Sequence, residues 1–336
     1  MSRPAAGQGT RLATWIDVTR PFTLLPPTLG VISGAVTAFG SAHNPDPSRS
    51  VTLAVILTVA LGSVCAAILN AASNVINQYY DIDIDRRNKP NRHLVTGAIS
   101  MRGAFVYAMI LYVVAILPTW LVVIHPYSGL RARLTAPLAM HECATIYLLG
   151  TFFTFVYSAP LFGRTKRHGM WANLTIAIPR GMLLKVAGWS MVASVCHLEP
   201  WFIGLIFMLF LLGASTTKDF SDMEGDRAGG CRTLPIKYGV RRSAWMIAPF
   251  FVFPWLLMPV GALVQNPLEP GTTILTGNPV VLSALGIALC LWGIYVCRLI
   301  LKRPEELAVV ENHVSWKHMY LMMMAAQIGF AAAYLM

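Results

Sequence analysis

Residues 53–79 read LAVILTVALGSVCAAILNAASNVINQY, an apolar run without a charged residue that passes directly into the acidic segment Tyr80-Asp-Ile-Asp-Ile-Asp85. About 20 apolar residues in a helix are enough to cross a hydrocarbon core of about 30 Å. The run is long enough for this, and it lacks the alternation of a strand. It therefore predicts a transmembrane helix whose end carries a cluster of carboxylates.

The rest of the chain has the same character. Of 336 residues, 56% are apolar and only 12% are charged, and the mean hydropathy is +0.59. A soluble domain carries about 25% charged residues, and a disordered chain is far less apolar. We expect an all-α, polytopic membrane protein with one domain over residues 1–336. Nine apolar segments predict nine transmembrane helices, at 22–40, 53–79, 103–124, 140–160, 172–195, 201–217, 243–264, 279–300 and 317–336.

Basic residues predict the orientation in the membrane. Loops on the N-terminal side of this nine-span arrangement, with the span ends beside them, hold 21 Lys and Arg residues, whereas the opposite loops hold three. Cytoplasmic loops carry such an excess. We expect a multi-pass protein with a cytoplasmic N-terminus, both acidic segments cytoplasmic, and the C-terminus on the opposite side. The net charge of +11 then indicates contact with anionic lipid rather than with nucleic acid, because the bases are spread over short loops.

A second acidic segment matches the first. Asn77, Asp81 and Asp85 are four residues apart, and so are Lys218, Asp222 and Asp226. Both segments follow an apolar span and run from acids into bases and then to a glycine, which makes them an internal pseudo-repeat. On a continuous helix each trio would share one face.

Carboxylates stacked on one face repel one another unless a cation lies between them. Mg²⁺ held by carboxylates and substrate phosphates is the usual arrangement, with Lys and Arg on the remaining phosphate oxygens. The alternative is that these carboxylates are merely solvated. It suits a single cluster better than two clusters in matched positions at the membrane border.

At these residues the chain resembles the UbiA superfamily of intramembrane prenyltransferases. That family carries N-x-x-x-D-x-x-x-D after its second helix and D-x-x-x-D after its sixth, where the predicted spans place both motifs. Gln78, His93 and Lys218 depart from the family pattern, but none replaces a carboxylate of the motifs. The likeness extends to Thr19-Arg-Pro21, to Asp85-Arg-Arg-Asn-Lys-Pro-Asn-Arg92, to Gly97-Ala-Ile-Ser100, and to Tyr157-Ser-Ala-Pro160 followed by Arg164, Lys166 and Arg167.

The second motif is informative within the superfamily. Glu224-Gly-Asp-Arg227 followed by Leu234-Pro235 resembles the version found in chlorophyll synthases and archaeal geranylgeranylglyceryl phosphate prenyltransferases. The resemblance implies a UbiA-type bundle with a cytoplasm-facing active-site cavity. It also implies Mg²⁺-dependent transfer of an isoprenoid chain from an allylic diphosphate to a lipophilic acceptor. An aromatic ring, a tetrapyrrole and a lipid alcohol all remain open as acceptors.

The resemblance also implies residue roles. Asn77, Asp81 and Asp85 would bind metal opposite Asp222 and Asp226, with two Mg²⁺ ions bridging the diphosphate. The predicted phosphate contacts are Lys89, Arg92 and Lys218. Tyr157, together with Tyr79, Tyr80 and Phe220, is a candidate for shielding an allylic cation.

Arg180 and Lys185 lie within the predicted fifth span. A charge at membrane depth faces a cavity by default, so Arg180 is a candidate for binding an acidic acceptor or the diphosphate. The alternative is a structural ion pair, for example with Glu142. His43, His125, His168 and His197 lie at predicted interfaces, where we expect structural roles, and no pair of cysteines has metal-ligand spacing.

Two other functions fit parts of the pattern. A cyclase of the same fold would act on the prenyl diphosphate without an acceptor, which Arg180 argues against. A divalent-cation transporter would use the aspartates for permeation. Transporters keep their carboxylates near mid-membrane depth, whereas these acids all lie at one surface.

Overall fold

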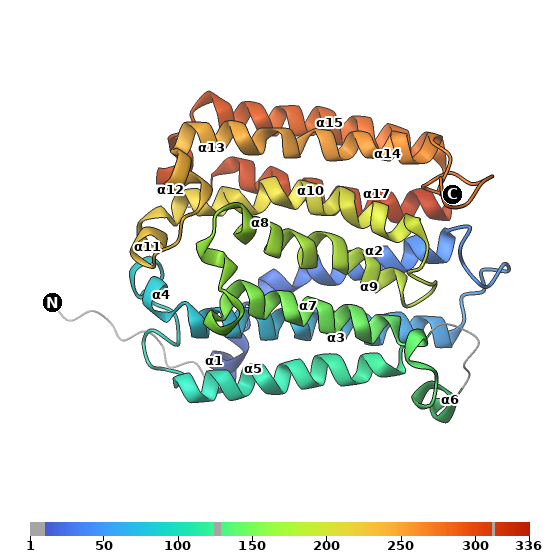
Figure 1. Ribbon diagram of the computed structural model, residues 1–336, viewed down its shortest axis with the longest axis horizontal. Coiled ribbons are helices and arrows are strands. Elements are labelled where there is room, and N and C mark those ends of the chain that lie inside the picture. The colour runs from blue at the N-terminus through green and yellow to red at the C-terminus, as the bar shows by residue number, and fades with distance from the viewer. Residues whose placement is uncertain (1–10, 124–128, 311–312) are drawn as a thin grey trace.

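The computed structural model describes residues 11–123, 129–310 and 313–336, and these residues form a helical bundle (Figure 1). The single β pairing in these three ranges is an isolated bridge between Gln265 and Thr273. The predicted all-helical class is therefore confirmed for the described part of the chain. His125 lies outside these residues.

Eight longer α-helices make up the bundle: α2 (Leu25–Gly40), α3 (Leu53–Tyr80), α5 (Met101–Ile116), α7 (Glu142–Ser158), α10 (Leu198–Ser221), α14 (Phe253–Leu263), α15 (Pro279–Lys302) and α17 (Val314–Leu335). The shorter α-helices are α1 (Arg11–Asp17), α4 (Ile82–Asn88), α6 (Leu130–Leu134), α8 (Met170–Ala177), α9 (Leu184–Trp189), α11 (Met223–Ala228), α12 (Leu234–Tyr238), α13 (Val240–Ile247) and α16 (Glu306–Val309). A π-helical turn, η6 (Ile178–Leu183), joins α8 to α9. The 3₁₀ turns are η1 (Pro21–Leu24), η2 (Leu117–Leu121), η3 (Leu138–Met140), η4 (Pro160–Phe162), η5 (Thr165–Arg167) and η7 (Ala248–Phe251).

The long helices lie side by side, with α3 against α5, α2 against α9 and α17, and α14 against α15 (Figure 1). The short helices α4, α11 and α12 gather at one end of the bundle, on the left of Figure 1. The C-terminal end of α17 lies at the opposite end. Ends of helices that are distant in the sequence therefore lie together at each of the two ends of the bundle.

Aromatic packing fixes α10 inside the bundle. The rings of Phe207 and Phe210 on α10 lie 6.0 Å and 5.0 Å from that of Trp255 on α14, measured between centroids. Phe207 also contacts Phe330 of α17 at 5.6 Å. Such pairs add about 0.5–1.5 kcal/mol each beyond the area they bury. They hold in place the helix whose C-terminal end carries the second acidic motif.

Within the described residues, seven segments are long and apolar enough to cross a membrane: 21–40, 53–80, 101–121, 198–221, 240–263, 279–302 and 314–335. The predicted spans at 140–160 and 172–195 are not among them. The first is α7, which has only 17 residues. The second is interrupted by η6, where Pro179 sits in a π-helical turn. Integral membrane insertion is therefore supported, and the count of nine spans remains a prediction.

The outer surface of the bundle is apolar. Leu57 on α3 is 59% exposed, and Leu291 on α15 is 63% exposed. Large apolar side chains are exposed in this way on most of the long helices. Contact with lipid explains this exposure, as expected for a multi-pass membrane protein.

Candidate active site

The two acidic motifs have the same backbone geometry. Helix α3 ends at Tyr80, Asp81 adopts φ −98° and ψ 13°, and α4 follows. Helix α10 ends at Ser221, Asp222 adopts φ −97° and ψ 6°, and α11 follows. The backbone N–H of Asp85 still donates to the carbonyl of Asp81 at 2.8 Å, and that of Asp226 to Asp222 at 3.0 Å. The pseudo-repeat seen in the sequence thus corresponds to a structural unit that occurs twice: a long helix, a break of one residue, and a short helix.

Helices α4 and α11 contact each other directly at one end of the bundle (Figure 1). The Asn88 side chain accepts a hydrogen bond from the Gly225 N–H at 3.0 Å and donates to the carbonyl of Asp222 at 3.3 Å. A Cβ atom at Gly225 would lie 2.2 Å from Asn88 Oδ1. The glycine of the Glu-Gly-Asp-Arg motif therefore permits the close approach that brings the two motifs together.

Basic side chains from the segment after α7 reach the first motif. Asp81 is 2% exposed, and its carboxylate pairs with Lys166 Nζ at 2.5 Å and with Arg164 at 3.0 Å. Arg164 also donates to the carbonyl of Tyr80 at 2.8 Å. Burial lowers the pKa of Lys166, but Asp81 more than compensates, so its pKa is raised. These two bases belong to the stretch that resembles the family after Tyr157-Ser-Ala-Pro160, but they were not among the predicted site residues.

The predicted phosphate-binding residues lie close to the motifs. Arg92 forms an ion pair with Asp85, and Lys89 Nζ lies 4.0 Å from the carboxylate of Asp222. Lys218 lies on the last turn of α10, with Nζ 5.6 Å from the ring centroid of Trp316.

Asp226 is a buried carboxylate, 4% exposed. Burial raises its pKa to about 6, and the neighbouring carboxylates of Asp222 and Asp81 act in the same direction. Burial likewise raises the pKa of Asp85, against the effect of Arg92. These couplings indicate that the carboxylates of the two motifs face a common space.

The other predicted site residues are distributed around that space. Asn77 and Tyr157 are partly buried, Asn77 on the last turn of α3 and Tyr157 on the last turn of α7. Phe220 is fully buried and belongs to the hydrophobic core, so it does not line the site. Tyr79 and Tyr80 pack against each other at 5.1 Å, beside α5.

Arg180 lies on η6 and lines a cavity together with Asn70 of α3 and Thr154 of α7. The side chain is exposed to this space. The suggested partner Glu142 is wrong, because its carboxylate instead accepts hydrogen bonds from Ser194 Oγ at 2.7 Å and Val195 N at 2.8 Å. Among the described residues Arg180 has no ion-pair partner, which favours a role towards a ligand.

The two remaining cations differ in setting. Lys185 is 1% exposed and donates to Ser33 Oγ at 2.7 Å, so it belongs to the bundle interior. Arg20 stands at the entrance to η1 in the left-handed conformation, with φ 57°. Burial lowers its pKa, and the positive charges of Arg92 and Arg180 lower it further. The guanidinium groups of Arg92 and Arg180 therefore each lie within electrostatic reach of Arg20.

The donor set suits a hard divalent cation. Carboxylate oxygens and an amide oxygen are the protein ligands that Mg²⁺ accepts. The buried Asp226 carboxylate has no hydrogen-bond or ion-pair partner in the described ranges, and an uncompensated buried charge is costly. No three carboxylates of these motifs lie within 4.8 Å of one another in the described chain. The motifs are therefore not arranged around a single ion.

Comparison with known proteins matches this geometry to a family. The profile described as the UbiA prenyltransferase family matches residues 24–316. The digeranylgeranylglyceryl phosphate synthase of Natronomonas pharaonis is 31% identical over 250 residues, which cover 72% of this chain and 76% of that protein. The bacteriochlorophyll synthase 34 kDa chain of Chloroflexus aurantiacus is 27% identical over 319 residues, covering 94% and 90%.

A solved structure supports the fold. The UbiA homologue from Archaeoglobus fulgidus bound to GPP and Mg²⁺ matches with a TM-score of 0.67 and 19% identity, covering 96% of this chain and 100% of that chain.

Proposed function

This chain belongs to the UbiA prenyltransferase family, and from that membership we propose how its site works. The protein is an intramembrane prenyltransferase, so the transporter alternative is set aside. We propose that an allylic prenyl diphosphate binds where α4 and α11 meet and that its chain passes to a lipophilic acceptor. The observation that carries this proposal is the Asn88–Gly225 contact, which holds the two carboxylate motifs together. Basic side chains lie against these motifs, namely Lys89, Arg92, Arg164 and Lys166.

The diphosphate is assigned to the basic side chains around the motifs. Arg20 lies within reach of the positive charges of Arg92 and Arg180, with Asp85 as the neighbouring carboxylate, and a diphosphate would add negative charge beside these cations. Lys166 and Arg164 lie against Asp81 of the first motif. Lys89 and Lys218 complete the set predicted from the sequence.

The metal is assigned to Asn77, Asp81 and Asp85 on one motif and to Asp222 and Asp226 on the other. Because these carboxylates do not surround one point, they suit two Mg²⁺ ions joined by the diphosphate. Bound Mg²⁺ would stabilise the negative charge that develops on the diphosphate as the allylic C–O bond breaks. The A. fulgidus homologue bound to GPP and Mg²⁺ supports this assignment.

The cavity beside Arg180 is proposed to take the acceptor. Its lining is mainly apolar, and its polar side chains are those of Arg180, Asn70, Ser73, Tyr147 and Thr154, as expected for a site that orients a lipophilic molecule. Arg180 would pair with an acid group of the acceptor. A lipid alcohol bearing phosphate and a tetrapyrrole both suit this, and the names of the two relatives support these classes.

The membrane arrangement completes the proposal. Helix α7 is about 26 Å long at 1.5 Å per residue, close to the minimum for a span. The chain α8–η6–α9 is proposed as the fifth span, with its π-helical turn exposing Arg180. With these two the proposed span count is nine, and the excess of basic residues supports a cytoplasmic location for the Asp motifs and their cavity.

The test uses protein purified in detergent with radiolabelled geranylgeranyl diphosphate, Mg²⁺ and a panel of acceptors. We expect lipid-soluble product that needs both metal and acceptor, and that is lost with EDTA or in Asp81→Asn. Asp83→Asn is the matched control, because Asp83 is exposed and pairs only with Arg86 among the described residues. Pyrophosphate release with a hydrocarbon product and no acceptor would favour the cyclase. Equal activity of Asp81→Asn and wild type would overturn the site assignment.

A further inference from the structure

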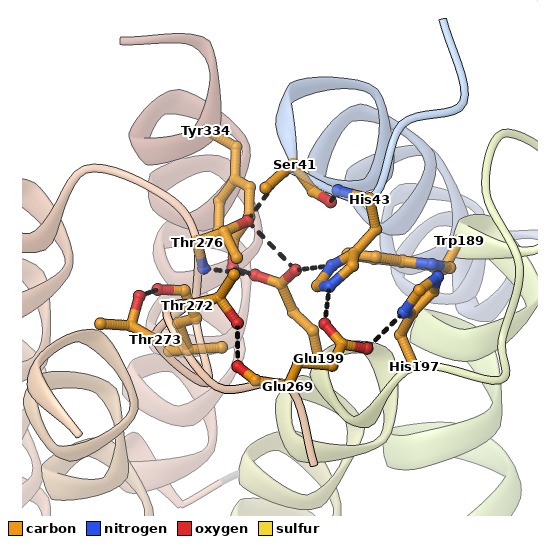
Figure 2. Close-up of polar contacts among 12 residues, drawn as sticks. Ser41, His43, Trp189, His197, Glu199, Glu269, Thr272, Thr273, Thr276 and Tyr334 are labelled. Carbon is orange, nitrogen blue, oxygen red and sulfur yellow. Dashed lines mark hydrogen bonds and ion pairs between the residues drawn. The ribbon is translucent and has the colours of Figure 1, made fainter. Parts of the chain in front are cut away.

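A second group of ionisable side chains lies at the end of the bundle opposite the Asp motifs. His43 follows α2, His197 and Glu199 stand at the start of α10, and Glu269 lies between α14 and α15 (Figure 2). Helix α10 has 24 residues, so its two ends are about 36 Å apart at 1.5 Å per residue. This His–Glu cluster is therefore distinct from the prenyl-transfer site.

The cluster gathers three potential metal ligands. The carboxylate of Glu269 lies 2.6 Å from His43 Nε2 through one oxygen and 2.6 Å from His197 Nδ1 through the other. The two imidazole rings lie 4.0 Å apart between centroids. Ligand atoms of all three residues lie within 4.8 Å of one another. Figure 2 shows them converging from three separate segments.

A fourth residue fixes the orientation of His43. Glu199 is 0% exposed, and its carboxylate lies 2.8 Å from His43 Nδ1. The same carboxylate accepts hydrogen bonds from the Thr276 N–H at 2.6 Å, the Thr276 hydroxyl at 3.1 Å and the Tyr334 hydroxyl. His43 is thus held by a rigid carboxylate on Nδ1 while Nε2 faces Glu269. Metal-binding histidines are oriented by a carboxylate in this manner.

The charges of the cluster also favour a divalent cation. In the metal-binding form both histidines are neutral, so Glu199 and Glu269 give a charge of −2, which a divalent ion neutralises. Carboxylates only accept hydrogen bonds, so without an ion the His43 nitrogens that face Glu199 and Glu269 must both carry protons. A metal would replace such a proton at Nε2.

We propose that His43 Nε2, His197 Nδ1 and the Glu269 carboxylate bind a Zn²⁺-class ion, with Glu199 orienting His43 and a fourth position open to solvent. Imidazole nitrogen selects Zn²⁺ over Mg²⁺. An ion between His43 Nε2 and the Glu269 carboxylate would make a bond of about 2.0–2.2 Å to each. These two ligand atoms would then lie farther apart than their present 2.6 Å, so Glu269 has to move outward. The side chains of Glu269 and His197 are 31% and 32% exposed, so both have room to move.

The ion would cross-link segments that are distant in the sequence. It would join the loop after α2, the start of α10 and the loop before α15, with α17 attached through Tyr334 and Glu199. Because such a site forms only in the folded chain, its binding free energy adds to folding stability.

The experiment measures Zn²⁺ binding to metal-stripped protein in detergent, by competition with a chromophoric chelator in excess Mg²⁺. Co²⁺ absorption and the Zn²⁺-induced shift in melting temperature provide independent readouts. We expect one tightly bound Zn²⁺ per chain in the wild type and in the double variant Asp81→Asn/Asp222→Asn. Binding should weaken about 100-fold in His197→Asn and in Glu269→Gln, and about 10–100-fold in Glu199→Gln.

Two matched controls make the assignment specific. Cys196→Ser removes the exposed thiol beside His197, and His168→Asn removes an exposed histidine remote from the cluster. Both should bind Zn²⁺ as the wild type does and show the same melting shift. Loss of the site in Cys196→Ser would overturn the ligand set. Retention of Zn²⁺ in His197→Asn and Glu269→Gln, or absence of tight Zn²⁺ in folded wild-type protein, would show that protons alone hold the cluster together.

Discussion

Gly225 is where the two motif-bearing helices come closest, so Gly225→Ala tests whether this contact positions the active site. The new Cβ would lie 2.2 Å from Oδ1 and 2.4 Å from Nδ2 of Asn88. Asn88 can yield only by giving up hydrogen bonds to α11, worth about 0.5–1.5 kcal/mol each. Otherwise α4 must move, and overpacking of this kind costs about 1–3 kcal/mol. A displacement of about 1 Å between catalytic groups costs roughly 100-fold in rate. We therefore expect kcat/KM of Gly225→Ala to fall about 100-fold.

The assay is initial-rate prenyl transfer in detergent, together with melting temperatures, for four proteins: wild type, Gly225→Ala, Asn88→Ala and the double variant. Asn88→Ala removes the atoms that clash, so adding Gly225→Ala to it should change kcat/KM less than about threefold. Residues in contact show such non-additivity. Gly30→Ala is the control, because its Cβ would meet only Gln327 and Leu184, at an ordinary 3.5 Å. An equal effect of Gly225→Ala in both Asn88 backgrounds would refute the reasoning.

Three further predictions concern other parts of the site and the membrane topology. Lys166→Gln should lower kcat/KM about 100-fold, because it removes a cation paired with the buried Asp81 carboxylate at 2.5 Å. Arg167→Gln, which changes an exposed side chain, should stay within threefold of the wild-type kcat/KM. Similar values for the two variants would contradict the assignment of Lys166 to the site. Arg180→Gln should raise KM for an acidic acceptor about tenfold, as expected for loss of one charged contact of about 1.5 kcal/mol. The KM for the prenyl diphosphate should remain unchanged. The reverse pattern would place the prenyl diphosphate, rather than the acceptor, beside Arg180. Cys196, the one exposed cysteine of the six, should react with a membrane-impermeant maleimide in intact cells. The double variant Arg167→Cys/Cys196→Ser should react only after permeabilisation. The opposite result would show that the topology is the reverse of the one proposed.

The acidic motifs show why the sequence was informative about this site. Each aspartate set follows the C-terminal end of a long apolar helix, and the i, i+4 spacing survives in the backbone hydrogen bonds across Asp81 and Asp222. Such features depend on residues within a few positions of one another. Composition and periodicity are therefore enough to predict the helices and the residues at their ends.

Two apolar segments show where local reasoning loses precision. Helix α7 has 17 residues, and Pro179 lies in a π-helical turn between α8 and α9. The hydropathy of a window does not register either feature. The second matters for function, because the turn presents Arg180 to a cavity while Lys185, a few residues on, is enclosed by the bundle.

The sequence by itself determined the helical class, the membrane environment and the two carboxylate motifs, because each depends on the composition and spacing of neighbouring residues. Only the tertiary structure decided which groups meet. Lys166 and Asp81 are 85 residues apart, Asn88 and Gly225 are 137 apart, and His43 and Glu269 are 226 apart. No local pattern encodes these pairs, since each depends on how the intervening helices pack. The places of Arg20, Arg164 and Lys166 at the active site, and the His–Glu cluster at the opposite end, therefore followed only from the assembled bundle.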